Sequence, residues 1–207
     1  YQSIQVLTPE KEGVNLPYNL KEVKVIRLPK RRILCELEAI QYLSKIKNKD
    51  NYDIICGTWH PEAILCKISG FKNIFVLAHG AELTSGNSTF RRKFWLPFYA
   101  KFILNNVKLT IANSNFTRNL VNKISNSASC KELPLGVNND FFRPSNLQIS
   151  NEVLKICTVS RIEEFKGHEF VAKTLLKLNK NYYGKITWSI AGTGGYLSKL
   201  IEAVDNL

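Results

Sequence analysis

Two cations, Arg161 and Lys166, lie five residues apart in a loop that follows a short apolar run. That run predicts a strand over 154–159, and Gly167 opens a helical pattern behind the loop. The loop is therefore expected at a strand's carboxyl end and beside a helix N-terminus, where unpaired N–H groups favour an anion. Arg161 could bind phosphate oxygens through its planar guanidinium and Lys166 as a point charge, a grip suited to a pyrophosphate. Alternatively, the two cations only keep an exposed loop soluble.

A glycine-rich loop, residues 192–195, follows the next predicted strand and precedes a helical pattern. Gly192, Gly194 and Gly195 could let backbone approach a ligand. Leu197 occupies the third glycine position of G-x-G-x-x-G, so the loop is not the dinucleotide fingerprint. A tight turn with no ligand is the alternative, and the neighbouring cations favour the binding role.

His79, Gly80 and Glu82 lie just after the predicted strand 74–78. Ligand crevices form at the carboxyl ends of strands in open parallel sheets. Gly80 would let a substrate approach the backbone, and His79 could donate a hydrogen bond to developing charge or titrate near neutrality. The alternative is a histidine satisfied by its own turn. Because no carboxylate stands at zinc-ligand spacing around His79, we expect no metal here.

The segment 91–102 combines Arg91, Arg92 and Lys93 with a cluster of aromatic residues. This makeup is typical of an element that lies in a membrane interface. The alternative is an aromatic stripe that faces the core and has a solvated basic edge. Pro97 should kink or restart a helix here.

Strand-like runs alternate with helical patterns along the chain, which predicts an α/β fold with parallel sheets and crossover helices. The polar stretch 145–152 lacks periodicity and reads as a linker between domains 1–145 and 146–207. The second domain shows only two strands before the chain stops, so we expect it to be incomplete. Strands are predicted at 4–7, 23–28, 52–56, 74–78, 109–112, 154–159 and 186–190, and helices at 33–46, 167–178, after Ser114 and from Leu197; 63–68 shows an apolar pattern, and 90–104 is a long mixed segment.

The formal net charge of +12 predicts an anionic partner: a nucleotide, a membrane surface or a nucleic acid. We do not expect nucleic acid, because the basic residues are spread along the chain and no nucleic-acid motif is present. Five cysteines without a C-x-x-C pair favour a reducing cytoplasm over a disulfide framework or a zinc site. No apolar run approaches the ~20 residues that span a bilayer. The sequence starts at Tyr1 and contains no Met, so we interpret it as a fragment.

Five short motifs in this order resemble family 4 retaining glycosyltransferases, from about Val6 to Leu207. The resemblance implies the GT-B architecture, in which two Rossmann-like parallel-sheet domains face each other across the active site. The motifs are His79-Gly-x-Glu82, Ala112-Asn-Ser-x-Phe-Thr117, Pro134-x-Gly-Val-x-x-x-x-Phe-x-Pro144, Val159-Ser-Arg-Ile-Glu-Glu-Phe-Lys-Gly167 and Ala191-Gly-Thr-Gly-Gly-Tyr-Leu-Ser-Lys-Leu200.

The resemblance implies transfer of a sugar, with retention, from a nucleotide-sugar donor to a glycan or lipid-linked acceptor, without a metal or cofactor. Arg161 and Lys166 would neutralise the leaving pyrophosphate, and the loop 192–195 would face the donor nucleotide. His79 would assist departure near the transferring sugar, with Gly80 and Glu82 on the acceptor side. Domain 1–145 would bind the acceptor, and 146–207 would begin the donor domain. We expect a cytoplasmic protein that could sit peripherally at the inner face of the cell membrane.

Three departures from the family pattern stand out. Asn138 replaces the usual Asp after Gly-Val, the glycine-rich loop expected after the first strand is absent, and the E-x7-E element would lie beyond Leu207. With half of the donor site missing, we expect these residues alone to be inactive. A sugar-nucleotide epimerase of the same fold and a truncated, non-catalytic relic are the competing interpretations.

Overall fold

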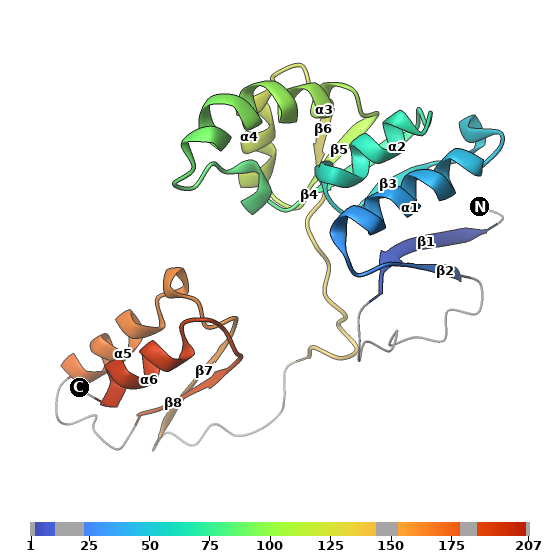
Figure 1. Cartoon of the computed structure of the whole chain (residues 1–207). Helices are drawn as coiled ribbons and strands as arrows, with labels where there is room; N and C mark the ends of the chain where they lie inside the picture. Colours follow the sequence, from blue (N-terminus) through green and yellow to red (C-terminus); the bar gives the residue numbers. More distant parts are fainter. Residues whose placement is uncertain (1–2, 11–22, 144–152, 179–185, 206–207) are drawn as a thin grey trace. The chain divides into compact units, whose positions relative to one another are not determined.

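The computed structural model describes residues 3–10, 23–143, 153–178 and 186–205 (Figure 1). The chain forms two compact units, residues 1–138 and residues 139–207. The expected linker 145–152 lies outside the described residues. Of the helices described, none combines the length and the apolar character needed to cross a bilayer.

Unit 1 is built on parallel strands, as the alternating pattern predicts. Four of them form one sheet in the order β3-β4-β5-β6, and β1 pairs with β2 separately. Strand β6 was not predicted, because its three residues, Cys-Lys-Glu, contain no apolar run. The strands are β1 (Ile4–Pro9), β2 (Val23–Leu28), β3 (Ile54–Cys56), β4 (Ile74–Ala78), β5 (Leu109–Ala112) and β6 (Cys130–Glu132).

The helices of unit 1 connect these strands, as crossovers between parallel strands must. The helix predicted after Ser114 is confirmed: the Thr117 N–H donates to the Ser114 side-chain oxygen at 3.2 Å, which caps the first turn. The helices are α1 (Arg32–Lys45), α2 (Ile64–Ile68), α3 (Lys101–Asn105) and α4 (Asn115–Ile124), with the wide π-type turns η2 (Trp59–Ala63) and η4 (Arg91–Ala100) and the short 3-10 turns η1 (Lys49–Asn51) and η3 (Ala81–Leu83).

The core of unit 1 surrounds β4, whose alternate residues Ile74, Val76 and Ala78 are fully buried. Helix η4 runs directly into α3, and their inner face adds Ala100 and Leu104 to this core. Removing such side chains from water is the main stabilising term for a fold of this kind. The sheet edge on which the carboxyl ends of β3, β4 and β5 lie is therefore rigidly supported.

Pro97 does not end the helix that contains it. Proline lacks an N–H donor, so an α-helix would lose a hydrogen bond at this point. The chain widens instead: the Lys101 N–H donates to the Leu96 carbonyl, five residues back. The expected kink or restart is thus replaced by a continuous helix.

Unit 2 pairs β7 (Leu154–Val159) with β8 (Ile186–Ala191) in parallel, from Leu154 opposite Ile186 to Val159 opposite Ala191. Helices α5 (His168–Lys177) and α6 (Leu197–Asp205) pack on each other and lie on one side of the strand pair (Figure 1). The 3-10 turn η5 (Glu164–Lys166) precedes α5. Phe170 in α5 is 74% exposed, and the helix buries His168 and Ala172.

Candidate functional site

The loops that follow β7 and β8 are hydrogen-bonded to each other. The Ser160 N–H donates to the Ala191 carbonyl at 3.2 Å and the Ile162 N–H to the Thr193 carbonyl at 2.9 Å. The Tyr196 N–H in turn donates to the Ile162 carbonyl at 3.1 Å. The structure therefore brings together the cation-bearing loop and the glycine-rich loop, at the carboxyl ends of both strands.

The three glycines of the second loop differ in what they do. A Cβ at Gly192 would lie 1.9 Å from the Ser160 carbonyl oxygen, and one at Gly194 would lie 2.1 Å from that of Ile162. A Cβ at Gly195 would meet only a side-chain oxygen of Glu163, at 4.0 Å. Packing between the loops alone thus requires glycine at 192 and 194, whereas Gly195 leaves backbone open to a ligand.

Arg161 and Lys166 are both exposed. Within the described part of the chain, neither side chain makes a hydrogen bond or ion pair, and the Lys166 Nζ lies 5.4 Å from the ring centroid of Phe165. Glu163 and Glu164 stand between the two cations, so two positive and two negative charges leave the loop neutral. An anion here would be held by two specific side chains and nearby N–H groups, and not by a general positive field.

A buried histidine positions this loop. His168, the first residue of α5, is only 2% exposed, and its Nε2 lies 3.0 Å from the Ser160 Oγ. Its Nδ1 is buried and has no partner among the described residues. Gly167, with φ of 74°, turns the chain into the helix. The contact between Ser160 and His168 therefore links the end of β7 to the start of α5 across the loop. This role of His168 was not predicted from the sequence.

A second contact ties α5 to the other loop. The Glu169 carboxylate accepts hydrogen bonds from the Lys173 Nζ and from the Tyr196 hydroxyl, both at 2.5 Å. The hydrogen bond from Lys173 lowers the pKa of Glu169 most, and the hydrogen bond from Tyr196 lowers it further. The hydrogen bond to Glu169 also raises the pKa of Tyr196. Glu169 is therefore ionised at neutral pH and anchors the first turn of α5 to the residue that follows Gly195.

In unit 1, His79 follows β4 as predicted and is exposed. The backbone N–H of His79 donates to a carboxylate oxygen of Glu82 at 2.7 Å, and the ring Nε2 lies 3.0 Å from the Gly57 carbonyl oxygen. Because a carbonyl only accepts, Nε2 carries the proton and Nδ1 is left for another partner. Gly80 has φ of 106°, and a Cβ there would lie 3.0 Å from the Thr117 Oγ1. The turn thus satisfies the His79 backbone, the Gly57 carbonyl satisfies one ring nitrogen, and the other ring nitrogen has no partner among the described residues.

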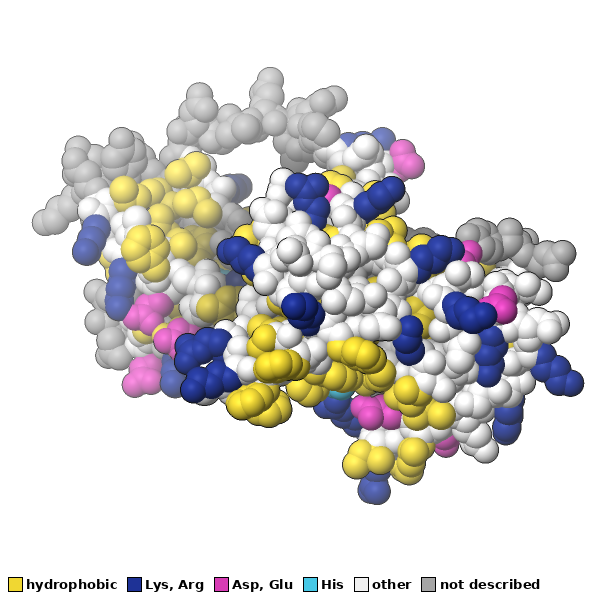
Figure 2. Space-filling model, turned by 90° about the horizontal axis from the view of Figure 1, so that it is seen from above, with side chains coloured by type: hydrophobic (Ala, Val, Ile, Leu, Met, Phe, Trp, Pro, Cys, Tyr) yellow, Lys and Arg dark blue, Asp and Glu magenta, His cyan; other side chains and the backbone are white. Residues whose placement is uncertain are grey.

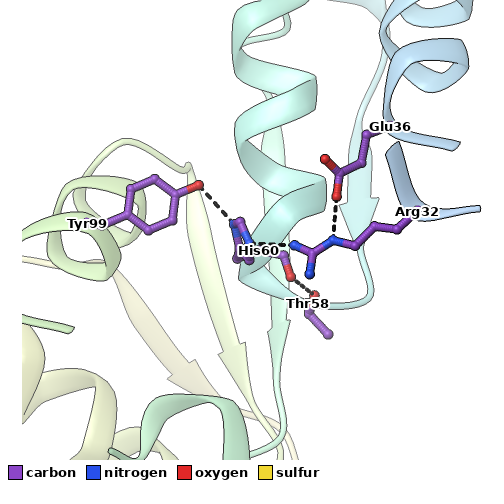
Figure 3. Close-up of polar contacts among 5 residues, drawn as sticks. All are labelled: Arg32, Glu36, Thr58, His60 and Tyr99. Atoms are coloured by element: carbon purple, nitrogen blue, oxygen red, sulfur yellow. Dashed lines mark hydrogen bonds and ion pairs between the residues drawn. The ribbon is translucent and has the colours of Figure 1, made fainter. Parts of the chain in front are cut away.

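A chain of polar contacts near these strand ends was not predicted. Figure 3 shows Arg32, at the start of α1, reaching between Glu36 and His60, while His60 also contacts Tyr99. The Arg32 Nη2 lies 3.2 Å from the His60 Nε2, and the Tyr99 hydroxyl lies 2.9 Å from the His60 Nδ1. The only available signal was that His60 follows a strand, β3, as His79 follows β4.

The protonation of His60 follows from its partners. Burial, and after it the Arg32 guanidinium, lowers the pKa of His60 against the opposing effect of Glu36. Because arginine can only donate, the His60 Nε2 accepts and Nδ1–H donates to the Tyr99 oxygen. The Tyr99 O–H proton is then available to a ligand, beside the Trp95 ring, whose centroid lies 4.6 Å from that of Tyr99.

Across the described residues, no three His, Cys, Asp or Glu side chains group so as to hold a metal ion. These sites offer two exposed cations and an open glycine backbone in unit 2, and groups that form hydrogen bonds in unit 1.

The two loop glycines with no room for a side chain should control the stability of unit 2. Replacement of Gly192 by Ala should force the loops apart and cost about 1–3 kcal/mol, as overpacking typically does. Gly195→Ala, in the same loop, should stay within about 0.5 kcal/mol. Hydrogen exchange of the β7 and β8 amides under denaturant would measure both, and equal protection in the two variants would contradict this account.

The low pKa of His60 should make stability depend on pH. The unfolded chain takes up a proton at about pH 6.5, whereas the folded chain does so only at a lower pH. The contribution of the neutral ring is thus complete above ~6.5 and is lost as the pH falls toward the folded value. Thermal unfolding of the wild type and His60→Asn across this range should show a steeper acid loss for the wild type. Parallel curves would disprove the assignment.

No family model matches the chain, and no curated protein matches it. Solved structures do. The apo structure of OtsA aligns with a TM-score of 0.58 and 16% identity, over 83% of this chain and 45% of that one. A structure of trehalose-6-phosphate synthase, studied for enzymatic glycosyltransfer with retention, aligns with a TM-score of 0.63 and 14% identity, over 98% of this chain and 62% of that one.

The chain thus spans less than two thirds of either neighbour. At these identities the likeness shows a fold and nothing finer. That fold is the GT-B type of α/β architecture with parallel sheets, as expected from the sequence.

Proposed function

We propose that this chain belongs to a retaining glycosyltransferase that takes a nucleotide-sugar donor, with unit 2 holding the donor diphosphate and unit 1 the acceptor. The observation that carries the proposal is the joined pair of loops at the ends of β7 and β8. They combine two exposed, unpaired cations among the described residues with an open glycine backbone at Gly195.

The proposed role of Arg161 and Lys166 is electrostatic. Cleavage of the bond between sugar and diphosphate leaves negative charge on the phosphate oxygens, and groups held in place for that charge stabilise the transition state. Arg161 can engage two oxygens at once, and Lys166 can follow the charge as a flexible ammonium. This arrangement neutralises the leaving group with side chains of the chain itself, so the proposal requires no metal ion or cofactor.

Unit 1 would supply groups for the acceptor and the transferring sugar. The His79 Nδ1, which has no partner among the described residues, and the Glu82 that fixes its turn lie at one strand end, whereas Gly80 is buried against Thr117 and shapes the turn. The Tyr99 hydroxyl and the Trp95 ring provide a donor and an apolar face, a combination that suits a sugar. The acceptor class that we propose is a glycan or a lipid-linked sugar.

A cytoplasmic location is part of the proposal. The five cysteines include no C-x-x-C pair, and the structure joins none of them by a disulfide bond; the nearest described sulfurs, those of Cys56 and Cys66, lie 3.9 Å apart. Thiols persist in a reducing compartment, which is also where nucleotide sugars would be met.

Binding of inorganic pyrophosphate and of uridine diphosphate to this chain, measured by calorimetry with a chelator present, tests the proposal. Arg161→Ala and Lys166→Ala should each weaken binding by about 10- to 150-fold, the worth of a charge-assisted hydrogen bond. Pyrophosphate makes the result independent of the donor base.

Lys177→Ala is the matched control, because Lys177 is an exposed cation of the same unit at the end of α5 that lies away from the loops. This variant should bind as the wild type does. Absence of pyrophosphate binding by the wild type, or an equal loss in all three variants, would rule out a specific diphosphate site.

A further inference from the structure

Four phenylalanines stand at every fourth position along η4 and α3. Phe90, Phe94, Phe98 and Phe102 are 62%, 57%, 68% and 53% exposed, respectively. Residues four apart in a helix lie on one face, so these rings form a single row. We call it the phenylalanine row.

The row is not the face by which the helix joins the core. Ala100, Ile103 and Leu104 are at most 2% exposed and supply that contact, and Trp95 and Leu96 pack against the same core. A helix that met only water would carry polar side chains opposite its buried face. Contiguous apolar surface of this kind marks an interaction site.

The charged side chains of the segment that carries the row are of one sign. Between Leu83 and Lys131 the sequence contains no Asp or Glu. Figure 2 shows more Lys and Arg than Asp and Glu over the face that it displays, with hydrophobic side chains gathered into patches. The stretch holds eight cations: Arg91, Arg92, Lys93, Lys101, Lys108, Arg118, Lys123 and Lys131.

Several of these cations are close to the phenylalanines in the sequence. Arg92, Lys93 and Lys101 are exposed on the same helices as the row. Arg91 is used differently, because its guanidinium donates to the carbonyls of Glu82 and Thr84 at 2.7 and 3.1 Å. That contact fixes the start of η4 to the turn that carries His79.

We propose that the phenylalanine row and its flanking cations are a docking surface for an anionic lipid bilayer. Apolar rings entering the boundary between headgroups and acyl chains, with Lys and Arg at the level of the phosphates, are the two components of interfacial helix binding. A second copy of the chain fits poorly, since two acid-free segments with eight cations each would face one another. The bilayer meets both the apolar and the charge requirement.

The proposal adds a surface that the proposed function does not require, and its test needs no sugar donor. The full chain would be sedimented with vesicles of phosphatidylcholine alone and of phosphatidylcholine with phosphatidylglycerol. Binding is expected only to the anionic vesicles, and to fall steeply when salt shortens the screening length to about 3 Å at 1 M.

Two double variants separate the components. Phe94→Ser with Phe98→Ser should weaken vesicle binding at least about tenfold, since each ring leaves the bilayer. Arg92→Glu with Lys93→Glu should do so by at least about 25-fold, or about fivefold for each cation lost. Because all four residues are exposed, thermal unfolding should remain as in the wild type.

The matched controls are Phe141→Ser with Phe142→Ser, which removes two rings that are 77% and 67% exposed elsewhere, and Lys24→Glu with Lys47→Glu. Both controls should bind vesicles as the wild type does. The proposal would be overturned by equal losses in the controls or by equal binding to neutral vesicles. It would also be overturned if the chain bound no vesicles and instead formed a dimer that the Phe94 and Phe98 changes dissociate.

Discussion

The close approach of the two loops at the ends of β7 and β8 is the constraint on which the rest of the candidate donor site depends. The carbonyls of Ser160 and Ile162 occupy the space that side chains would take at Gly192 and Gly194. This leaves the backbone on both sides of Arg161 hydrogen-bonded to the neighbouring loop. Because the residues on both sides of Arg161 are held in place, Arg161 loses less conformational entropy when it binds an anion. The packing of the two backbones therefore favours binding of a charged ligand.

Unit 1 presents its polar groups by the same construction. His79 directly follows β4 and His60 lies four residues after β3, and in each ring Nε2 contacts a neighbour from another part of the chain. This contact fixes the tautomer: in His79 the proton is on Nε2, and in His60 it is on Nδ1. The tautomer of each ring decides which group can bind a further partner: in His79 it is Nδ1, and beside His60 it is the hydroxyl of Tyr99. The strand ends thus determine where the rings lie, and the contacts at Nε2 determine how the rings are oriented.

Much of this arrangement could be predicted from the sequence, because it is local. The strands 74–78, 109–112 and 154–159 are marked by apolar runs of the right length, and the cap at Ser114 by its residue type. The proximity of the two loops followed from the rule that parallel strands end at one edge of a sheet.

The contacts that escaped prediction join residues far apart in the chain, or depend on what covers a helix. His60 and Tyr99 are 39 positions apart, and Glu169 and Tyr196 are 27 apart, and no spacing rule connects them. Phe170 has the position of a buried residue but is exposed, because the inner face of α5 is taken by His168 and Ala172. Strand β6 is held by its neighbour β5, and not by any apolar character of its own.

The first turn of α5 is joined to two strands at once. His168 connects it to the end of β7, and Glu169 connects it through Tyr196 to the segment after β8. Tilting the helix toward either strand would strain the link to the other. The end of unit 2 that carries the two loops should therefore move as a single stiff block, with any adjustment confined to the long side chains of Arg161 and Lys166.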